Sequence, residues 1–404
     1  MTTFKDFNFI EQLNEGLEMM GFKTPTPIQQ QAIPLILNNK DMIACAQTGT
    51  GKTAAFVLPI LHKLYGNQSK KINTIIITPT RELALQIDRQ IEGFSYFTNA
   101  SSFAVYGGGT GSDFDAQKKA IKNGSDIIVC TPGRLLAHMK FNYFDASGVK
   151  HFILDEADRM LDMGFYDDIM SIEKKLPKQR QNLMFSATMP PKIRKLAHEI
   201  LVTPESISLN ISKPAEGITQ KAYMVHDYQK IELTKEILKQ KTLEHVLIFC
   251  STKKSVKELT RSLNKTGLPA KDIHSDLEQE QREKALLDFK NKKIKILVAT
   301  DILSRGIDIK GIELVINFEV PNDAEDYVHR IGRTARADRK GEAITYINAD
   351  QCRKFKQIED LIEKTLPKTP LPPHFDSAPK YQFKKIKKQG RFKRHKSKKR
   401  WQKK

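Results

Sequence analysis

The stretch Ala46-Gln47-Thr48-Gly49-Thr50-Gly51-Lys52-Thr53 decides the fold class. It follows the apolar run Asp41–Ala46, precedes a helical pattern and matches G-x-x-x-x-G-K-[ST], except that Ala46 replaces the first glycine. Glycines let the backbone turn so that successive N–H groups point at phosphate oxygens, and the helix N-terminus adds a favourable dipole. The stretch therefore predicts a strand, a phosphate-binding loop and a helix. A glycine-rich turn without a ligand is the alternative for this motif alone.

Further apolar runs alternate with helical patterns along the chain. Runs this apolar are typical of strands buried on both faces, in a parallel sheet that is covered by helices. The first set comprises Asp41–Ala46, Thr74–Thr78, Ser102–Tyr106, Asp126–Cys130, His151–Leu154 and Asn182–Phe185. The second set comprises His245–Cys250, Ala270–His274, Ile294–Ala299, Leu314–Phe318 and Ala343–Ile347. The repeat predicts an α/β protein with two similar parallel-sheet domains in tandem.

Composition shifts suggest the domain boundaries. We expect a first domain over 1–210, a linker over 211–218, a second domain over 219–366 and a tail without regular structure over 367–404. The linker carries Pro214 and Gly217 and shows no clear period. Prolines crowd the first part of the tail, which disfavours regular structure there.

The end of the chain concentrates the positive charge. Lys380–Lys404 contains 14 Lys or Arg and no Asp or Glu, out of a formal net charge of +20 for the whole chain. Such a low-complexity segment cannot bury a core and is predicted to be disordered. Aromatic residues lie among these charges, a mixture suited to single-stranded nucleic acid. We expect the tail to tether nucleic acid, and a solubility tail is the alternative.

The remaining composition indicates an intracellular protein. No apolar run approaches the ~18 residues that a membrane span needs, and the start of the chain lacks a secretory pattern. The four cysteines form no C-x-x-C pair, which argues against a zinc site or a disulfide framework. We therefore expect no membrane association, buried free thiols and a reducing cytoplasm.

A pair of adjacent acids supports nucleotide chemistry. Asp155 ends the run Phe152–Leu154, at the position where an acid meets Mg²⁺ in P-loop ATPases. Glu156 can orient or deprotonate the attacking water. A solvated loop is the alternative, but acids at the end of a buried strand need a partner such as a metal. Together with Lys52 and Thr53, these residues predict Mg²⁺-dependent hydrolysis of ATP or GTP.

The run Asp155-Glu156-Ala157-Asp158 resembles the motif that names the DEAD-box RNA helicases of superfamily two, and further motifs of this family follow its order. The resemblance extends from Phe4 to Leu366. It includes Gly21–Gln29, Pro79–Ala84, Gly107-Gly108, Thr131–Arg134, Ser186–Thr188, Leu247–Thr252, Gln279 with Arg282, Ala299–Asp301 with Arg305–Asp308, and His329–Arg336. The wording of Met160–Phe165 and Met184–Pro191 is most similar to the bacterial RhlE-type subgroup.

This resemblance implies two RecA-like domains and an ATP site shared between them. Gln29 can pair bidentately with adenine, which would select ATP over GTP, although by its type alone it would simply begin the polar face of a helix. The implied ATP-binding residues are Phe4, Phe22, Gln29, Ala46, Gln47, Thr48, Gly49, Thr50, Gly51, Lys52, Thr53 and Asp308, with Thr53 and Asp155 as Mg²⁺ ligands. The implied catalytic residues are Lys52, Asp155, Glu156, Arg333 and Arg336. The two arginines would share a helix face and reach the γ phosphate, and an exposed basic face is the alternative.

The resemblance also implies RNA as the partner, through contacts that carry little sequence information. The implied RNA-binding residues are Pro79, Thr80, Arg81, Gly108, Thr131, Pro132, Gly133, Arg134, Thr300 and Gly306. The implied coupling residues are Asp158, Ser186, Thr188, His329 and Arg330, for which a hydrogen-bonded network without function is a rival. We expect RNA-stimulated ATP hydrolysis that drives local, non-processive unwinding or remodelling by domain closure. The alternatives are an ATP-gated RNA clamp or annealing factor, and a DNA translocase. We expect a monomer that acts in ribosomal or RNA-decay assemblies.

Overall fold

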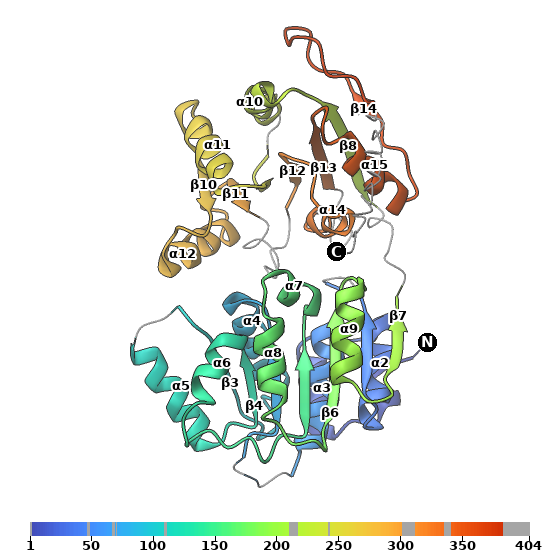
Figure 1. Ribbon diagram of the computed structural model, residues 1–404, viewed down its shortest axis with the longest axis vertical. Coiled ribbons are helices and arrows are strands. Elements are labelled where there is room, and N and C mark those ends of the chain that lie inside the picture. Colours follow the sequence, from blue (N-terminus) through green and yellow to red (C-terminus); the bar gives the residue numbers. More distant parts are fainter. Residues whose placement is uncertain are drawn as a thin grey trace, which may run out of the picture.

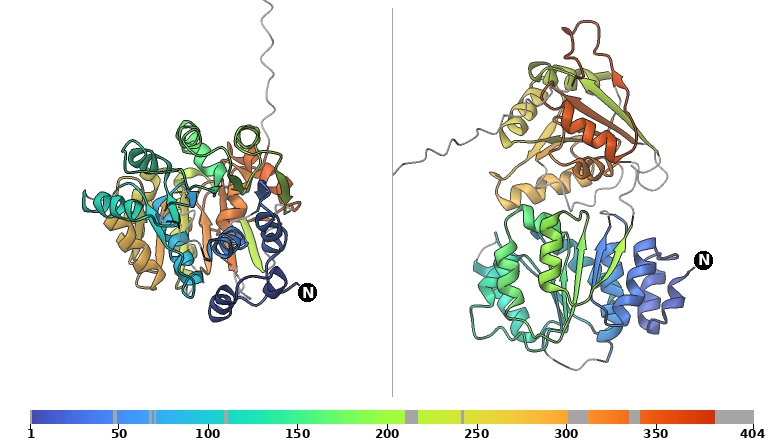
Figure 2. Two further views of the ribbon diagram at one scale, coloured as in Figure 1. Left: turned by 90° about the horizontal axis from the view of Figure 1, so that it is seen from below. Right: turned by 45° about the vertical axis from the view of Figure 1, so that its right-hand side comes forward.

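The computed structural model describes residues 2–46, 49–66, 69, 71–108, 111–209, 217–240, 243–300, 312–334 and 341–382. These residues form two seven-stranded sheets, one from each half of the chain. Figure 1 shows the two sheets one above the other, and Figure 2 shows helices on both faces of each. The predicted α/β class with two tandem parallel-sheet domains is confirmed.

The first sheet has the order β3-β4-β2-β5-β6-β1-β7, and all of its pairs are parallel. Its strands are β1 (Met42–Cys45), β2 (Thr74–Ile77), β3 (Ser102–Val105), β4 (Ile127–Cys130), β5 (His151–Leu154), β6 (Gln181–Ser186) and β7 (Glu205–Ser208). The six runs predicted as strands are confirmed. The edge strand β7 was not predicted, because only Ile207 of its residues is buried and the apolar signal is weak.

Helices cover both faces of this sheet. They are η1 (Phe4–Phe7), α1 (Glu11–Met19), α2 (Pro27–Leu37), α3 (Lys52–Leu64), α4 (Arg81–Phe94), α5 (Gly111–Asn123), α6 (Pro132–His138), α7 (Ala157–Asp162), α8 (Tyr166–Glu173) and α9 (Pro191–Ile200). The helices α2, α3 and α4 share one apolar core, and α7, α8 and α9 share the core on the other face. Burial of the sheet on both faces explains why its central strands are apolar throughout.

The second sheet has the order β10-β11-β9-β12-β13-β8-β14. Its strands are β8 (Ile218–Met224), β9 (Val246–Cys250), β10 (Ala270–Ile273), β11 (Ile296–Thr300), β12 (Leu314–Asn317), β13 (Gly341–Ile347) and β14 (Lys368–Thr369). Its helical elements are η2 (Asp227–Gln229), α10 (Lys230–Gln240), α11 (Lys253–Lys265), α12 (Gln279–Lys290), α14 (Ala324–Ile331) and α15 (Cys352–Leu361). The five runs predicted as strands are confirmed. β8 was missed, and it begins at the last residue of the predicted linker; residues 210–216 lie outside the described residues.

The predicted tail begins too early. Residues 367–382 do not lack structure: β14 pairs with β8, and Leu371 and Phe375 pack against the core of the second sheet. The carboxylate of Glu359 anchors this segment, because it accepts hydrogen bonds from Lys368 at 2.6 Å and from the Tyr381 hydroxyl at 2.8 Å. Prolines are compatible with such an extended edge segment, although they exclude a helix. Residues 383–404 lie outside the described residues.

Within the described ranges, no helix is long and apolar enough to cross a membrane.

Candidate active site

The predicted phosphate loop connects β1 to α3. Gly49 and Gly51 have φ values of 87° and 92°, which L side chains rarely adopt, so the glycines are required by the backbone. Lys52 is the first residue of α3 and is buried, and its ammonium donates to the Ala46 carbonyl at 2.9 Å. The lysine therefore folds back across the loop. Gln47 and Thr48 lie outside the described residues.

Gln29 joins the loop to the N-terminus of α2. Its side-chain oxygen accepts from the Thr26 N–H at 2.9 Å, and its side-chain nitrogen donates to the Gly51 carbonyl at 3.1 Å. A glutamine amide has two acceptor positions and two donor hydrogens. One acceptor position and one donor hydrogen of Gln29 are left, and adenine recognition requires this pair. Phe4 and Phe22 pack edge to face at 6.0 Å, so Phe4 belongs to an aromatic cluster beside α2.

Asp155 and Glu156 follow the end of β5, and both side chains are buried. Burial raises the pKa of Asp155 to about 6, against an opposing effect of the Lys52 ammonium. Glu156 has φ 53°, a left-handed conformation that costs roughly 1–2 kcal/mol for a residue with a Cβ. Burial thus disfavours the charged form of Asp155, which lies near Lys52 and next to a residue with a strained backbone. Such a combination is typical of a functional site.

The predicted coupling residues of the first domain lie together. The Asp158 carboxylate accepts from the Thr188 N–H at 3.1 Å, and the Ser186 hydroxyl donates to the Thr188 carbonyl at 2.7 Å. Asp158 is in α7 and Ser186 ends β6, so these contacts connect the acidic motif to the neighbouring strand. A movement of α7 would therefore shift or break the hydrogen bond to Thr188.

The predicted RNA residues of the first domain lie in the loops that follow β2, β3 and β4 and in the first turns of α4 and α6. These loops lie at the same edge of the sheet as the phosphate loop, where α/β proteins bind ligands. Thr80 precedes α4, and its hydroxyl accepts from the Leu83 N–H at 3.3 Å. Pro79 is buried, whereas Gly108 and Gly133 are exposed, with open space where a Cβ would lie. Thr131 precedes Pro132, the first residue of α6.

The two arginines of these loops lie beside Tyr106. The Arg81 guanidinium lies 4.3 Å from the centre of the Tyr106 ring and 2.8 Å from the Glu283 carboxylate in α12 of the second domain. The Arg134 side chain donates to the Tyr106 carbonyl at 2.9 Å. Arg81 therefore has a carboxylate partner at the position where the sequence predicts a phosphate.

The second domain contributes fewer described site residues. Thr300 ends β11 and is half-buried. Arg330 is buried and donates to the Asn317 side chain at 3.1 Å, next to His329 in α14. α14 ends at Ile331, so Arg333 does not lie on a helix as predicted; it follows the helix and is buried. Three further predicted residues lie outside the described ranges: Gly306, Asp308 and Arg336.

Both halves of the chain match known helicase families. Residues 26–196 match the DEAD/DEAH box helicase family, and residues 229–338 match the helicase conserved C-terminal domain. The CshA RNA helicase of Listeria monocytogenes is 41% identical over 91% of this chain and 70% of its own length. The CshA of Bacillus subtilis is 42% identical over 90% of this chain and 73% of its own length. The chain belongs to the DEAD-box ATP-dependent RNA helicases.

Solved DEAD-box structures agree with this assignment. Dbp5 of S. cerevisiae, bound to RNA and ADP BeF3, has a TM-score of 0.81 and 29% identity over 92% of this chain and 96% of its own. Mss116 bound to ssRNA and UDP-BeF has a TM-score of 0.82 and 30% identity over 92% of this chain and 81% of its own. The helicase therefore has two tandem RecA-like domains. The relatives named above are CshA proteins, so they do not support the RhlE-type subgroup.

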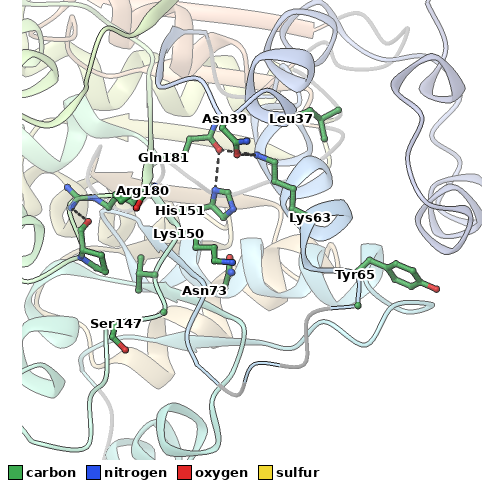
Figure 3. A pocket seen from close by; sticks show the side chains of 15 residues that line it. Leu37, Asn39, Lys63, Tyr65, Asn73, Ser147, Lys150, His151, Arg180 and Gln181 are labelled. Carbon is green, nitrogen blue, oxygen red and sulfur yellow. Dashed lines mark hydrogen bonds between the residues drawn. The ribbon is translucent and has the colours of Figure 1, made fainter.

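This helicase also has a hollow at the other edge of its first sheet (Figure 3). The hollow has a volume of about 1190 Å³ and is lined by residues that precede or begin β2, β5 and β6, including Asn73, His151 and Gln181. Lys63 contacts the Asn39 side chain at 2.7 Å there. None of the residues predicted to bind ATP or RNA lines it, so the hollow is separate from the candidate active site.

Proposed function

We propose that this helicase hydrolyses ATP at the loop between β1 and α3 and uses the cycle to separate or remodel short stretches of RNA duplex. The observation that carries this proposal is the convergence of Lys52, Gln29 and Asp155 at one end of the first sheet. Gln29 is bonded to the loop through Gly51 at 3.1 Å, and Lys52 is near enough to Asp155 to oppose the rise of its pKa. Base recognition and phosphate binding are thereby joined to the acidic motif.

The residues present fit Mg²⁺ as the metal that accompanies ATP. Thr53 and Asp155 supply the oxygen atoms that this ion prefers, and phosphate oxygens with water complete its shell in such sites. No group of three His, Cys, Asp or Glu in the described part of the chain could hold a metal alone, which is consistent with an ion that arrives with its nucleotide. The ion would neutralise charge on the phosphates, and Glu156 would orient the attacking water.

The second domain would complete both sites. Arg333, Arg336 and Asp308 would approach the nucleotide, and Thr300 and Gly306 would contact the RNA backbone opposite the loops of the first domain. ATP and RNA then each favour the closed arrangement and bind cooperatively, by the reciprocity of linked equilibria. The contact between Asp158 and Thr188 supports communication between the acidic motif and the RNA side. Loss of the γ phosphate would reopen the cleft, so unwinding would be local and non-processive.

ATP turnover by the Lys52→Ala variant tests this function. The intact protein should hydrolyse ATP faster with single-stranded RNA than with single-stranded DNA or without nucleic acid. The variant should lose this activity, because it lacks the cation that reaches the β and γ phosphates. RNA-stimulated hydrolysis by Lys52→Ala would overturn the proposal. Unwinding and strand-annealing assays run in parallel distinguish a helicase from an RNA clamp or annealing factor.

The basic end of the chain is proposed to tether RNA. Deletion of residues 383–404 removes most of the concentrated positive charge and spares Tyr381, whose hydroxyl bonds to Glu359 at 2.8 Å. The deletion should raise the RNA concentration required for stimulation and flatten its dependence on salt, because fewer phosphates are neutralised. An unchanged salt dependence would identify a solubility tail instead.

We further propose a cytoplasmic monomer that acts within ribosomal or RNA-decay assemblies. The four described cysteines are buried and none is in a disulfide, which supports a reducing compartment. Light scattering with and without RNA tests the monomer.

A further inference from the structure

A ladder of aromatic rings runs along α5 and α6 from the predicted RNA site to the surface. We define the aromatic ladder as Phe114, His138, Phe141 and Tyr143. The Phe114 and His138 rings stack with centres 4.3 Å apart, and the Phe141 and Tyr143 rings stack with centres 5.5 Å apart. Phe114 also meets Phe141 edge to face at 6.1 Å, so the four rings are contiguous. Figure 1 shows α5 beside α6 at the outer edge of the first domain.

The inner end of the ladder is attached to the RNA loops. The Arg134 guanidinium lies 5.0 Å from the centre of the Phe114 ring, and its side chain donates to the Tyr106 carbonyl. Gln117 donates to the same carbonyl at 3.0 Å and bonds the His138 ring at 3.0 Å. The side chains that hold the predicted phosphate contacts are therefore packed directly against the ladder.

The outer end of the ladder is exposed. Phe141 is 50% exposed, although its ring stacks on the Tyr143 ring. One ring connects Phe141 to Arg134, because the Phe114 ring lies 5.0 Å from the Arg134 guanidinium and 6.1 Å from the Phe141 ring. An RNA strand bound at Arg134 could therefore reach the exposed Phe141 ring.

Lysines surround the exposed end. The ammonium groups of Lys118 and Lys122 lie 5.6 and 5.9 Å from the centre of the Tyr143 ring, and Lys140 is exposed next to Phe141. None of the three lysines forms an ion pair with a carboxylate among the described residues. The nearby acids Asp113 and Asp115 lie in the first turns of α5, whereas Lys118 and Lys122 lie in its second half. Lysine ammonium groups therefore gather at the outer end of the ladder, and the Asp115 carboxylate near Tyr143 forms no described ion pair with them.

We propose that the outer end of the aromatic ladder binds the RNA strand where it continues beyond the predicted RNA loops. Phe141 stacks on a base, and Lys118, Lys122 and Lys140 neutralise phosphates. Stacking tolerates any base, and lysines recognise only charge, so this surface matches a partner that is bound without regard to sequence. The inference rests on the proposed RNA site and extends it by one binding surface.

The test compares single-stranded RNA of about 6 and about 12 nucleotides, which bracket the predicted loops alone and the loops with the ladder. Affinities are measured on the full chain with a non-hydrolysable ATP analogue. Phe141→Ala should weaken binding of the longer strand by at least fivefold and leave that of the shorter strand unchanged, because one stacked base contributes roughly that much. Phe141→Tyr should bind the longer strand like the intact protein. Phe141→Leu, which keeps the apolar contact but not the ring, should bind it as weakly as Phe141→Ala.

Further variants test the contribution of lysine charge and the dependence of the effect on position. Lys122→Gln should reduce the slope of affinity against salt by about 0.7, the value for one phosphate on a single strand. The matched controls are Tyr96→Ala, an exposed ring beyond α4, and Lys174→Gln, an exposed lysine after α8. Both controls should bind the two strands like the intact protein, and neither control should change kcat at saturating RNA.

Three outcomes would overturn the inference. The first is an equal loss of RNA affinity in Phe141→Ala and Tyr96→Ala, and the second is an equal loss for both strand lengths in Phe141→Ala. The third is an affinity of Phe141→Leu for the longer strand that equals that of the intact protein. The second would show that Phe141 only supports the RNA loops, and the third that it only packs. Failure of the proposed function itself would appear separately, as an intact protein whose ATP turnover does not respond to RNA.

Discussion

A single glycine sets the shape of the nucleotide site. Gly51 combines a left-handed backbone with close contact to Gln29, because a Cβ at this position would lie 2.4 Å from the Gln29 side-chain nitrogen. Gly66 also has a left-handed backbone, with φ 76°, but open space where its Cβ would lie. Substitution of Gly66 by alanine therefore strains only the backbone, whereas substitution of Gly51 also crowds the Gln29 side chain.

We predict that Gly51→Ala raises the KM for ATP at least tenfold, because the added methyl group displaces Gln29 from the loop. Gly66→Ala should leave the KM unchanged, since it carries only the backbone cost of roughly 1–2 kcal/mol in stability. The measurements are ATP turnover with saturating RNA and thermal unfolding of both variants. Equal KM values in Gly51→Ala and the intact protein would show that Gln29 does not shape the ATP site.

The strand β5 connects two environments of the first domain. Asp155 follows its end at the candidate active site, and His151 begins it beside the hollow of Figure 3. Burial lowers the pKa of His151 to about 4, and the charges of Lys63 and Lys150 act in the same direction, against a hydrogen bond to Gln181. His151 is therefore neutral in the folded protein at any pH above about 4.

This burial predicts a loss of stability in acid. The pKa of an unfolded histidine is about 6.5, so between pH 6.5 and 4 the unfolded chain binds more protons than the folded one. The free energy of unfolding is thus unaffected by His151 above pH 6.5 and falls as pH drops through this window, by up to about 3 kcal/mol. His151→Asn, which keeps a side-chain donor toward Gln181, should make this fall shallower.

Denaturant unfolding at several pH values between 7.5 and 4.5 measures the effect. His198→Asn is the matched control, because this histidine is exposed on α9. The expectation fails if His151→Asn and His198→Asn lose stability equally on acidification.

At the scale of the whole molecule, the two domains touch through a residue that was predicted to bind RNA. Arg81 forms an ion pair at 2.8 Å with Glu283 in α12 of the second domain, and the two side chains are 18% and 45% exposed. A phosphate at Arg81 would have to replace this carboxylate. The contact therefore competes with RNA in the arrangement that the structure shows.

We predict that Glu283→Gln strengthens RNA binding in the absence of nucleotide. Exposed ion pairs contribute about 0.2–1 kcal/mol, so the dissociation constant should fall by up to about fivefold. Fluorescence anisotropy with labelled single-stranded RNA measures this change. Glu280→Gln provides the control, because Glu280 is an exposed acid in the same helix and its substitution removes the same charge. If both variants gain equally, the effect is one of net charge and not of the ion pair.

The sequence by itself determined the central strands, the phosphate loop and the acidic motif. These features are local: a strand buried on both faces must be apolar throughout, and the turns at Gly49 and Gly51 need residues without a Cβ. The order of the motifs then indicated the helicase family. Each of these signals lies within a few consecutive residues, so no knowledge of distant contacts was required.

The tertiary structure alone decided which distant residues meet. The edge strands β7 and β14, and β8 next to β14, carry weak or interrupted apolar patterns, because they are stabilised by pairing with strands far away in the sequence. The docking of Tyr381 on Glu359, the pairing of Arg81 with Glu283 and the stacking of Phe141 on the aromatic ladder likewise depend on packing between elements. Residue type and spacing specify a local conformation, whereas these contacts exist only once the sheets have assembled.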